Sequence, residues 1–216
     1  MAVASAVGAT IEWYDFFLYG TAAGLVFDKL FFNGLDGPAA QFAAFGTFAV
    51  GFLARPIGGL IFGHFGDRIG RKKMLILTLL IMGVGTALIG LLPSYDSIGV
   101  WAPILLIVLR ILQGIGVGGE YGGAVLLAVE YAPAERRGFY GSAAHIGVPG
   151  GLLLAAGAFS IAGLLPDEAF LAWGWRVCFL VSILLLGIGA YIRLQVMESA
   201  ALARVQERKE VSRVPL

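Results

Sequence analysis

The sequence has little charge. Of its 216 residues, only 13% are Asp, Glu, Lys or Arg, whereas a soluble domain carries about 25%. This low share excludes an ordinary soluble enzyme, because such an enzyme needs charged side chains over its whole surface. The formal net charge is +1, so the composition gives no reason to expect a nucleic acid or an acidic partner.

Cysteine and the usual catalytic groupings are scarce too. Cys178 is the one cysteine, which excludes an internal disulfide framework and a cysteine-based metal site. The two histidines are far apart in the sequence, and no Ser/His/Asp grouping, G-x-S-x-G motif or phosphate-binding loop occurs. A G-x-G-x-x-G match at 114–119 lies inside an apolar run with no strand before it, so it does not predict a dinucleotide site. We therefore expect no enzyme activity, no catalytic residues, no metal and no cofactor.

Apolar residues make up 59% of the chain, and they form long runs. A membrane-spanning helix needs about 20 apolar residues at 1.5 Å rise per residue. Six segments qualify and predict an all-α integral membrane protein with six transmembrane helices: roughly Ala4–Phe27, Ala39–Phe65, Met74–Leu92, Val100–Val129, Gly138–Leu165 and Ala172–Leu194.

The basic residues gather on one side of these six expected spans. Only Lys29 and Arg176 fall on the other side, which predicts that both termini are cytoplasmic. Residues 1–196 would then be a six-helix transmembrane domain, and residues 197–216 a charged cytoplasmic segment. The ten basic residues on the cytoplasmic side are Arg68, Arg71, Lys72 and Lys73 after the second span, Arg136 and Arg137 after the fourth, and Arg204, Arg208, Lys209 and Arg213 after the sixth.

Glycine is abundant, with 32 residues. Some of these glycines recur every four residues within the second and fourth expected spans. Small residues four positions apart line one face of a helix and let a neighbouring backbone approach closely. Tight packing alone would also explain any single glycine. The series are Gly51, Arg55, Gly59 and Gly63 in the second span, and Gly114, Gly118 and Gly122, with Gly119 and Gly123, in the fourth.

Five ionisable residues lie inside the expected spans: Glu12, Asp15, Arg55, Arg110 and Glu120. On insertion scales they oppose membrane insertion by about 15 kcal/mol in total. Such residues persist where they face a protein interior or a water-filled cavity. Helical spacing places Tyr19 on the face of the two acids of the first span, and Gln113 on the face of Arg110.

Three acids face two arginines in this set, so pairing leaves one carboxyl group without a fixed counter-ion. A carboxyl group in a low-dielectric cavity can bind and release a proton near neutral pH. We therefore expect Glu12, Asp15 or Glu120 to carry a coupling proton, and an arginine to bind an anionic group of a substrate. A set of static ion pairs that fixes helix packing is the alternative.

The segment 63–73 reads GHFGDRIGRKK. It resembles the cytoplasmic signature of the major facilitator superfamily, G-x-x-x-D-R-x-G-R-[RK], at every fixed position. The fourth span, through Glu130 to Arg137, is similar to the spaced pattern of sugar-porter-like members. Glu198-Ser199 resembles their P-E-S-P-R element in part, because Met197 and Ala200 stand where the two prolines would be.

Further matches resemble one branch of that superfamily, the metabolite:proton symporters. They are the segment 8–20, which reads GATIEWYDFFLYG, the residues from Arg110 to Glu120, and Trp175-Arg176 at the start of the sixth span. The resemblance covers nearly the whole chain. It implies import of organic acids and zwitterions such as α-ketoglutarate, citrate, shikimate, proline and betaine. It also implies a charge network that closes the cytoplasmic side in the outward-facing state, formed by Asp67, Arg68, Arg71, Glu130, Arg137 and Glu198.

Residues and resemblance together predict proton-coupled symport of a small anionic or zwitterionic metabolite across the plasma (inner) membrane by alternating access. A sugar-porter-like carrier, or a non-transporting or truncated membrane protein on the same fold, are the alternatives. The superfamily has twelve spans in two halves, so the chain corresponds to the N-terminal half. The C-terminal six-helix half would be truncated, encoded separately or replaced by a second copy, and we favour truncation. The expected partners are the substrate, protons, the lipid bilayer and that second half.

Overall fold

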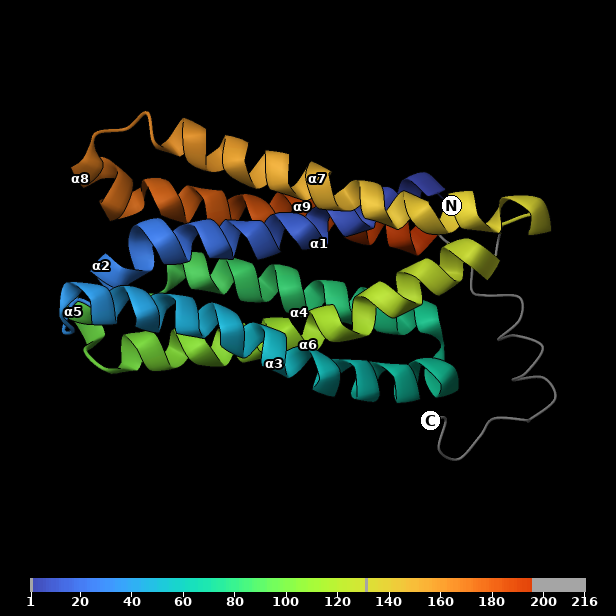
Figure 1. Ribbon diagram of the computed structural model, residues 1–216, viewed down its shortest axis with the longest axis horizontal. Coiled ribbons are helices and arrows are strands. Elements are labelled where there is room, and N and C mark those ends of the chain that lie inside the picture. Colours follow the sequence, from blue (N-terminus) through green and yellow to red (C-terminus); the bar gives the residue numbers. More distant parts are fainter. Residues whose placement is uncertain (1, 131, 196–216) are drawn as a thin grey trace.

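The computed structural model describes residues 2–130 and 132–195, with the side chains at 2–5, 67, 71–72, 120–128, 130, 134, 143–144 and 193–195 left out. The described regular structure is helical throughout (Figure 1). The long helices are α1 (Ala2–Ala22), α3 (Gly37–Ile69), α4 (Arg71–Leu91), α6 (Trp101–Glu130), α7 (Arg137–Ala162) and α9 (Trp175–Gln195). The short elements are η1 (Ala23–Phe27), α2 (Asp28–Leu30), α5 (Tyr95–Ile98), η2 (Ala134–Arg136), α8 (Asp167–Ala169) and η3 (Phe170–Gly174).

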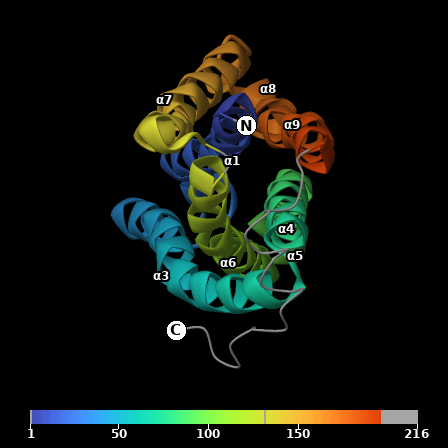
Figure 2. The same ribbon diagram turned by 90° about the vertical axis from the view of Figure 1, so that its right-hand side faces the viewer.

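The long helices run side by side, and successive connections lie at alternate ends of the bundle (Figure 1). The principal pairs are α1 with α7, α3 with α6, and α4 with both α6 and α9. The end-on view in Figure 2 shows α1 toward the middle of the arrangement, and α1 contacts α3, α4, α6, α7 and α9. Side chains of α1 are therefore the ones that can meet partners from every other long helix.

Five helical segments of the described residues are long and apolar enough to cross a membrane: Gly37–Gly66, Lys73–Leu91, Trp101–Gly119, Arg137–Ala162 and Asp167–Ile192. The 21-residue helix α1 is not among them, because Glu12, Asp15 and several small or hydroxyl-bearing residues lower its hydropathy. The structure thus has a helix at each of the six expected spans, and five of these helices are long and apolar enough to cross a membrane. The first expected span, Ala4–Phe27, stays a prediction.

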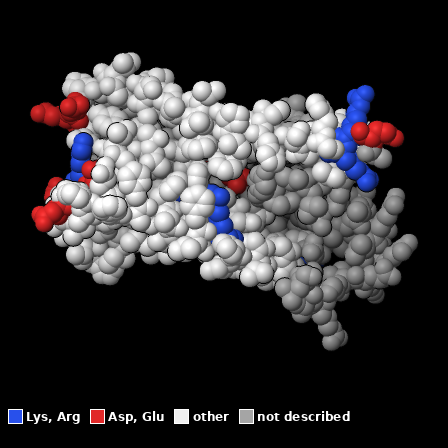
Figure 3. Space-filling view, in the orientation of Figure 1, with Lys and Arg blue, Asp and Glu red and all other residues white. Residues whose placement is uncertain are grey.

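The outer surface of the bundle is apolar. Large hydrophobic side chains are strongly exposed on several helices, for example Phe42 at 79%, Leu53 at 76% and Leu153 at 72%. On the face shown in Figure 3, charged side chains lie at the two ends, apart from a few near the middle. Exposed apolar surface between two charged ends is the pattern of helices packed in lipid.

The junction between α3 and α4 differs from the sequence prediction. We expected a basic loop there, but the helices extend until a single residue, Gly70, separates them. Arg68 lies in the last turn of α3, and Arg71 begins α4. Gly70 has φ +116°, a backbone conformation that side-chain-bearing residues rarely adopt. One glycine therefore turns the chain, and the basic residues belong to the helix ends.

The glycine series predicted that a neighbouring backbone approaches each of the two spans closely, and the structure shows that α3 and α6 approach each other at three glycines of α6. A Cβ atom added at Gly114 would overlap with the carbonyl oxygen of Gly51, and one added at Gly118 would overlap with that of Arg55. Gly119 lies against Phe62. These positions let the two backbones touch.

Two further glycines of α3 correct the predicted spacing. Gly63 belongs to the expected series, yet no atom of the described residues lies within 4 Å of its would-be Cβ. Gly58 is outside that series, and its Cβ would overlap with the carbonyl oxygen of Ile115. The first three members of the expected series, Gly51, Arg55 and Gly59, do lie against α6, so the contact face of α3 includes Gly58 beside them and does not extend to Gly63 among the described contacts. The surroundings of Gly122 and Gly123 are outside the described part of the chain.

Candidate functional site

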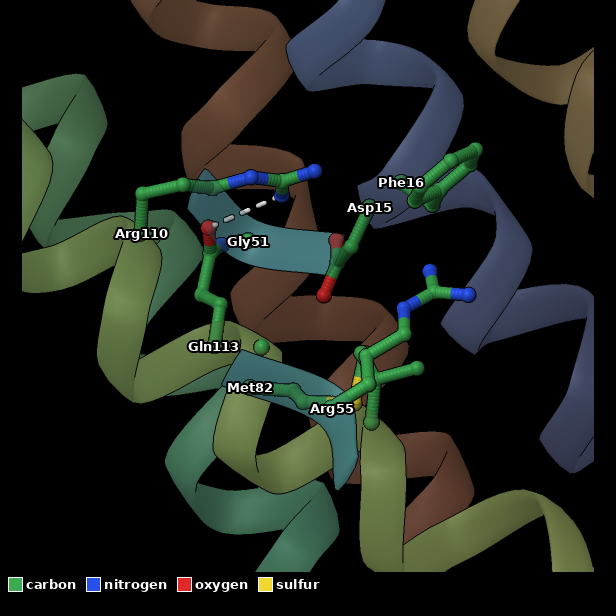
Figure 4. Close-up of a pocket in the computed structure, with 9 residues that line it drawn as sticks. Asp15, Phe16, Gly51, Arg55, Met82, Arg110 and Gln113 are labelled. Carbon is green, nitrogen blue, oxygen red and sulfur yellow. Dashed lines mark hydrogen bonds between the residues drawn. The ribbon is translucent and has the colours of Figure 1, made fainter. Parts of the chain in front are cut away.

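Three of the ionisable residues predicted inside the spans are buried near the middle of the bundle. The exposed fractions are 5% for Glu12, 2% for Asp15 and 4% for Arg110, and Arg55 is partly buried. They come from α1, α3 and α6. A small pocket brings four of the predicted residues together, because Asp15, Arg55, Arg110 and Gln113 all line it. Figure 4 shows the Asp15 carboxyl group pointing into the space between Gln113 and Arg55.

Asp15 has a partner on α9 that the sequence did not suggest. The hydroxyl group of Ser182 donates a 2.7 Å hydrogen bond to Oδ1 of Asp15, and both residues are buried. A second hydrogen bond links the two helices. The hydroxyl of Tyr14, the residue before Asp15, donates a 2.7 Å bond to the carbonyl oxygen of Cys178, one turn before Ser182 on α9. The two bonds fix the face of α1 that carries Asp15 against α9.

Arg110 begins a chain of hydrogen bonds from α6 to α4. Its Nη1 donates to Oε1 of Gln113 at 3.3 Å, and Nε2 of Gln113 donates to the hydroxyl of Thr86 at 2.7 Å. Thr86 in turn donates to the carbonyl oxygen of Met82 at 3.0 Å. The predicted shared face of Arg110 and Gln113 is therefore confirmed, and Gln113 holds the guanidinium group in place.

The Nε of Arg110 is buried and has no hydrogen-bond partner among the described residues. A buried polar group without a partner is costly, and each such group in a protein calls for an explanation. Arg110 lines the pocket, which in this structure has room for about one water molecule, so a ligand group would reach Arg110 only in a state in which the pocket is wider.

Aromatic rings surround both arginines. The Cζ of Arg110 lies 4.1 Å from the ring centroid of Tyr19, 5.0 Å from that of Phe48 and 5.7 Å from that of Phe16. Arg55 lies 4.4 Å from Phe52 and 4.8 Å from Phe16. At these distances the ring faces attract the cations electrostatically.

Tyr19 takes part in the site through its ring. Its hydroxyl group donates a 2.6 Å hydrogen bond to Thr47, whose hydroxyl donates to the carbonyl oxygen of Ala44 at 2.6 Å. These bonds hold the Tyr19 ring against Arg110. The sequence placed Tyr19 on the face of the two acids of α1, and in the structure its ring lies against Arg110 of α6.

Glu12 faces a second, more open pocket with Trp13, Phe52, Arg55, Pro56 and Gly59 among its lining residues. Glu12 and Arg55 interact electrostatically there. Arg55 lines both pockets, so it lies on the wall between Glu12 and Asp15. The two acids of α1 therefore belong to neighbouring pockets.

Several predicted residues lie beyond what the structure describes. These are Glu198 entirely and the side chains of Glu120, Asp67, Arg71 and Glu130. Of the predicted cytoplasmic network, Arg68 and Arg137 are described, and both are exposed. Within the described residues there is no group of three or more His, Cys, Asp or Glu that could hold a metal ion.

Comparison with known proteins places the chain in a family. The sequence profile described as "Sugar (and other) transporter" matches residues 1–214. The chain is 50% identical to the shikimate transporter of Escherichia coli K12, over all of this chain and 50% of that protein. It is 44% identical to the proline/betaine transporter of the same organism, over 96% of this chain and 41% of that protein.

The fold has solved counterparts as well. The inward-open structure of the xylose transporter XylE from E. coli is similar with a TM-score of 0.79 and 21% identity, over 97% of this chain and 50% of that one. The chain spans about half the length of the curated relatives it matches. Its relatives are transporters and not enzymes. The chain belongs to the sugar (and other) transporter family of the major facilitator superfamily and is a multi-pass protein of the plasma membrane.

Proposed function

We propose that the chain forms one half of a proton-coupled transporter that imports a small anionic or zwitterionic metabolite by alternating access. Six helices would span the membrane, with α1 as the first of them, and both termini would lie on the cytoplasmic side. The excess of basic residues on that side supports this orientation. The substrate would bind near the midplane, between this half and a second one.

The observation that carries the proposal is the buried Arg110 beside the pocket. Its guanidinium group is held by Gln113 and by three aromatic rings, while its Nε has no partner among the described residues. Arginine presents N–H groups in a fixed planar fork that matches a carboxylate. A carboxylate in this pocket would satisfy Arg110 and bring Arg55 within reach. The names of the shikimate and proline/betaine transporters agree with a carboxylate-bearing substrate.

Asp15 is the acid that we propose for the coupling proton. It is the most buried of the described acids, shares its pocket with both arginines, and accepts a hydrogen bond from Ser182. A buried carboxyl group that changes its charge there would alter the field on Arg110. Proton binding and substrate binding would then be coupled through one pocket.

We also propose the latch at the cytoplasmic end that the motif resemblance implies, formed by Asp67, Arg68, Arg71, Glu130, Arg137 and Glu198. The end of α3 and the start of α7 lie at the same end of the bundle (Figure 1). Charged groups at that rim would pair in one state and separate when the two halves rock apart.

Uptake by the complete translated product of the gene tests the function. The protein is reconstituted in proteoliposomes and given radiolabelled shikimate, α-ketoglutarate, proline, betaine or xylose, with and without an imposed proton gradient. We expect accumulation of at least one carboxylate-bearing compound, increased about tenfold or more by an inward proton gradient, and none of xylose. Accumulation of xylose alone would support a sugar carrier, and binding without transport would support a non-transporting protein.

Neutralising the acids one at a time tests the proton site. In Asp15→Asn we expect proton-driven accumulation to fall about tenfold or more, while exchange of labelled for unlabelled substrate continues, because exchange needs no net proton movement. Glu12→Gln and Glu120→Gln are the matched variants in the same assay. If all three substitutions leave the accumulation unchanged, the proton relay is wrong.

A further inference from the structure

The two arginines of the site share one group of aromatic side chains. This aromatic cluster consists of Phe16 and Tyr19 on α1 and Phe48 and Phe52 on α3. The ring centroid of Phe16 lies 4.8 Å from that of Phe48 and 5.2 Å from that of Phe52. The centroids of Phe48 and Phe52 are 5.3 Å apart. The rings therefore form one continuous surface beside the pocket.

Phe16 has a special place in the cluster, because both guanidinium groups contact it. Arg55 lies 4.8 Å and Arg110 5.7 Å from its centroid, whereas Tyr19 and Phe48 contact Arg110, and Phe52 contacts Arg55. The two cations also lie close enough to repel each other. Phe16 thus attracts both members of a pair that would otherwise move apart.

Ring faces and carboxylates hold an arginine in different ways. A carboxylate takes up the N–H groups of the guanidinium plane, but a ring attracts the cation without accepting those N–H groups in ordinary hydrogen bonds. The Nε of Arg110, which has no hydrogen-bond partner among the described residues, agrees with this difference. The aromatic cluster attracts both cations and, at Arg110, leaves the Nε–H without an acceptor among the described residues.

We propose that Phe16 is a positioning residue for the substrate: its ring holds Arg55 and Arg110 at the spacing at which both can face one bound carboxylate group. This inference rests on the proposed transport of a carboxylate-bearing metabolite. Phe16 itself does not need to touch the substrate. Its contribution is the electrostatic attraction of its ring, which a substituent that withdraws electrons from the ring weakens.

The neighbouring Phe17 provides a matched control. It lies on the same turn of α1, and its ring contacts Trp13 at 5.5 Å and Phe16 at 5.4 Å. Among the described residues it has no cation contact at ring distance, in contrast to Phe16. A change in ring electronics at position 17 should therefore alter packing or hydrophobicity alone.

The test replaces Phe16, in the complete translated product, by phenylalanine with one, two or three ring fluorines. Fluorination weakens the attraction of the ring for cations while nearly preserving its shape. We expect KM for radiolabelled shikimate or α-ketoglutarate to rise stepwise, by about tenfold with three fluorines, while kcat changes less than about twofold. The same series at Phe17 should leave KM unchanged.

Two ordinary variants complete the test. Phe16→Tyr keeps the ring and should keep KM within about twofold, whereas Phe16→Leu should raise it at least as far as the trifluorinated ring. A flat KM across the Phe16 series, with uptake intact, would overturn the role of Phe16 and leave the proposed function standing. If the unsubstituted protein transports none of the carboxylate-bearing compounds of the uptake panel, both the function and this inference are wrong.

Discussion

Replacing Arg110 by glutamine is expected to lower the initial rate of substrate uptake by about 100-fold or more. Removing one partner of a buried, hydrogen-bonded charge pair costs about 2–5 kcal/mol, and each 1.4 kcal/mol corresponds to about a tenfold change. Glutamine at position 110 can still bond to Gln113, so the chain of bonds to Thr86 can persist. The loss would therefore be a loss of substrate binding.

Initial uptake rates, measured at equal amounts of folded protein, test this expectation. Arg110→Lys should lie between the wild type and Arg110→Gln, because lysine keeps the charge but loses the planar fork. Arg176→Gln is the matched control, since Arg176 is partly buried but bonds to the carbonyl oxygens of Gly90 and Leu92, away from the pocket. Uptake by Arg110→Gln within about threefold of wild type would contradict the role of Arg110.

The helices of the bundle follow closely from the sequence, because five of the six apolar runs are followed by glycine, proline or a charged residue. The expected span Val100–Val129, for example, corresponds to α6 at Trp101–Glu130. The junction after α3 was not predictable in the same way. Arg68 and Arg71 are compatible with either a loop or a helix end, and only the backbone angle of Gly70 shows that the turn takes one residue.

The candidate site was predictable where its members are close in sequence. A three-residue spacing on one helix places Gln113 beside Arg110, and the structure contains that contact. Ser182 and Thr86 were not predictable, because they reach the site from α9 and α4. Their contribution depends on how the helices are rotated against one another, which the spacing within one helix does not determine.

The contacts between aromatic rings and arginines on different helices also depend on how the helices are rotated against one another. Phe48 and Phe52 are four residues apart and share a face of α3, which the sequence shows. Phe52 contacts Arg55 within α3 itself, whereas the contact of Phe48 with Arg110 requires that this face turn toward α6. In a membrane helix an apolar face can meet lipid or protein, and composition does not distinguish the two.

The backbone contact between α3 and α6 at Gly58 leads to a second large expected effect. Gly58→Ala should lower the thermal midpoint of unfolding by about 5–10 °C, because the new Cβ would overlap with the backbone carbonyl of Ile115. A backbone atom cannot move aside as a flexible side chain can, so the helices must separate. Overpacking of this kind costs about 1–3 kcal/mol, and each 1 kcal/mol shifts the midpoint by about 2–4 °C in a chain of this size.

Gly63→Ala is the matched control for this variant. Gly63 lies on the same helix, but no atom of the described residues approaches its would-be Cβ, so the midpoint should change by less than about 2 °C. The midpoints can be followed in detergent by the loss of the monodisperse peak after heating. Equal midpoints for the two variants would mean that Gly58 does not lie at a backbone contact.

The reciprocal glycine of α6 makes the test stricter. A Cβ at Gly118 would overlap with the carbonyl oxygen of Arg55 on α3, so Gly118→Ala pushes the same two helices apart from the other side. Once one substitution has separated the backbones, the second Cβ meets less obstruction. The double variant Gly58→Ala/Gly118→Ala should therefore be destabilised by less than the sum of the two single changes. Additive losses would mean that each alanine is accommodated locally, without separation of the helices.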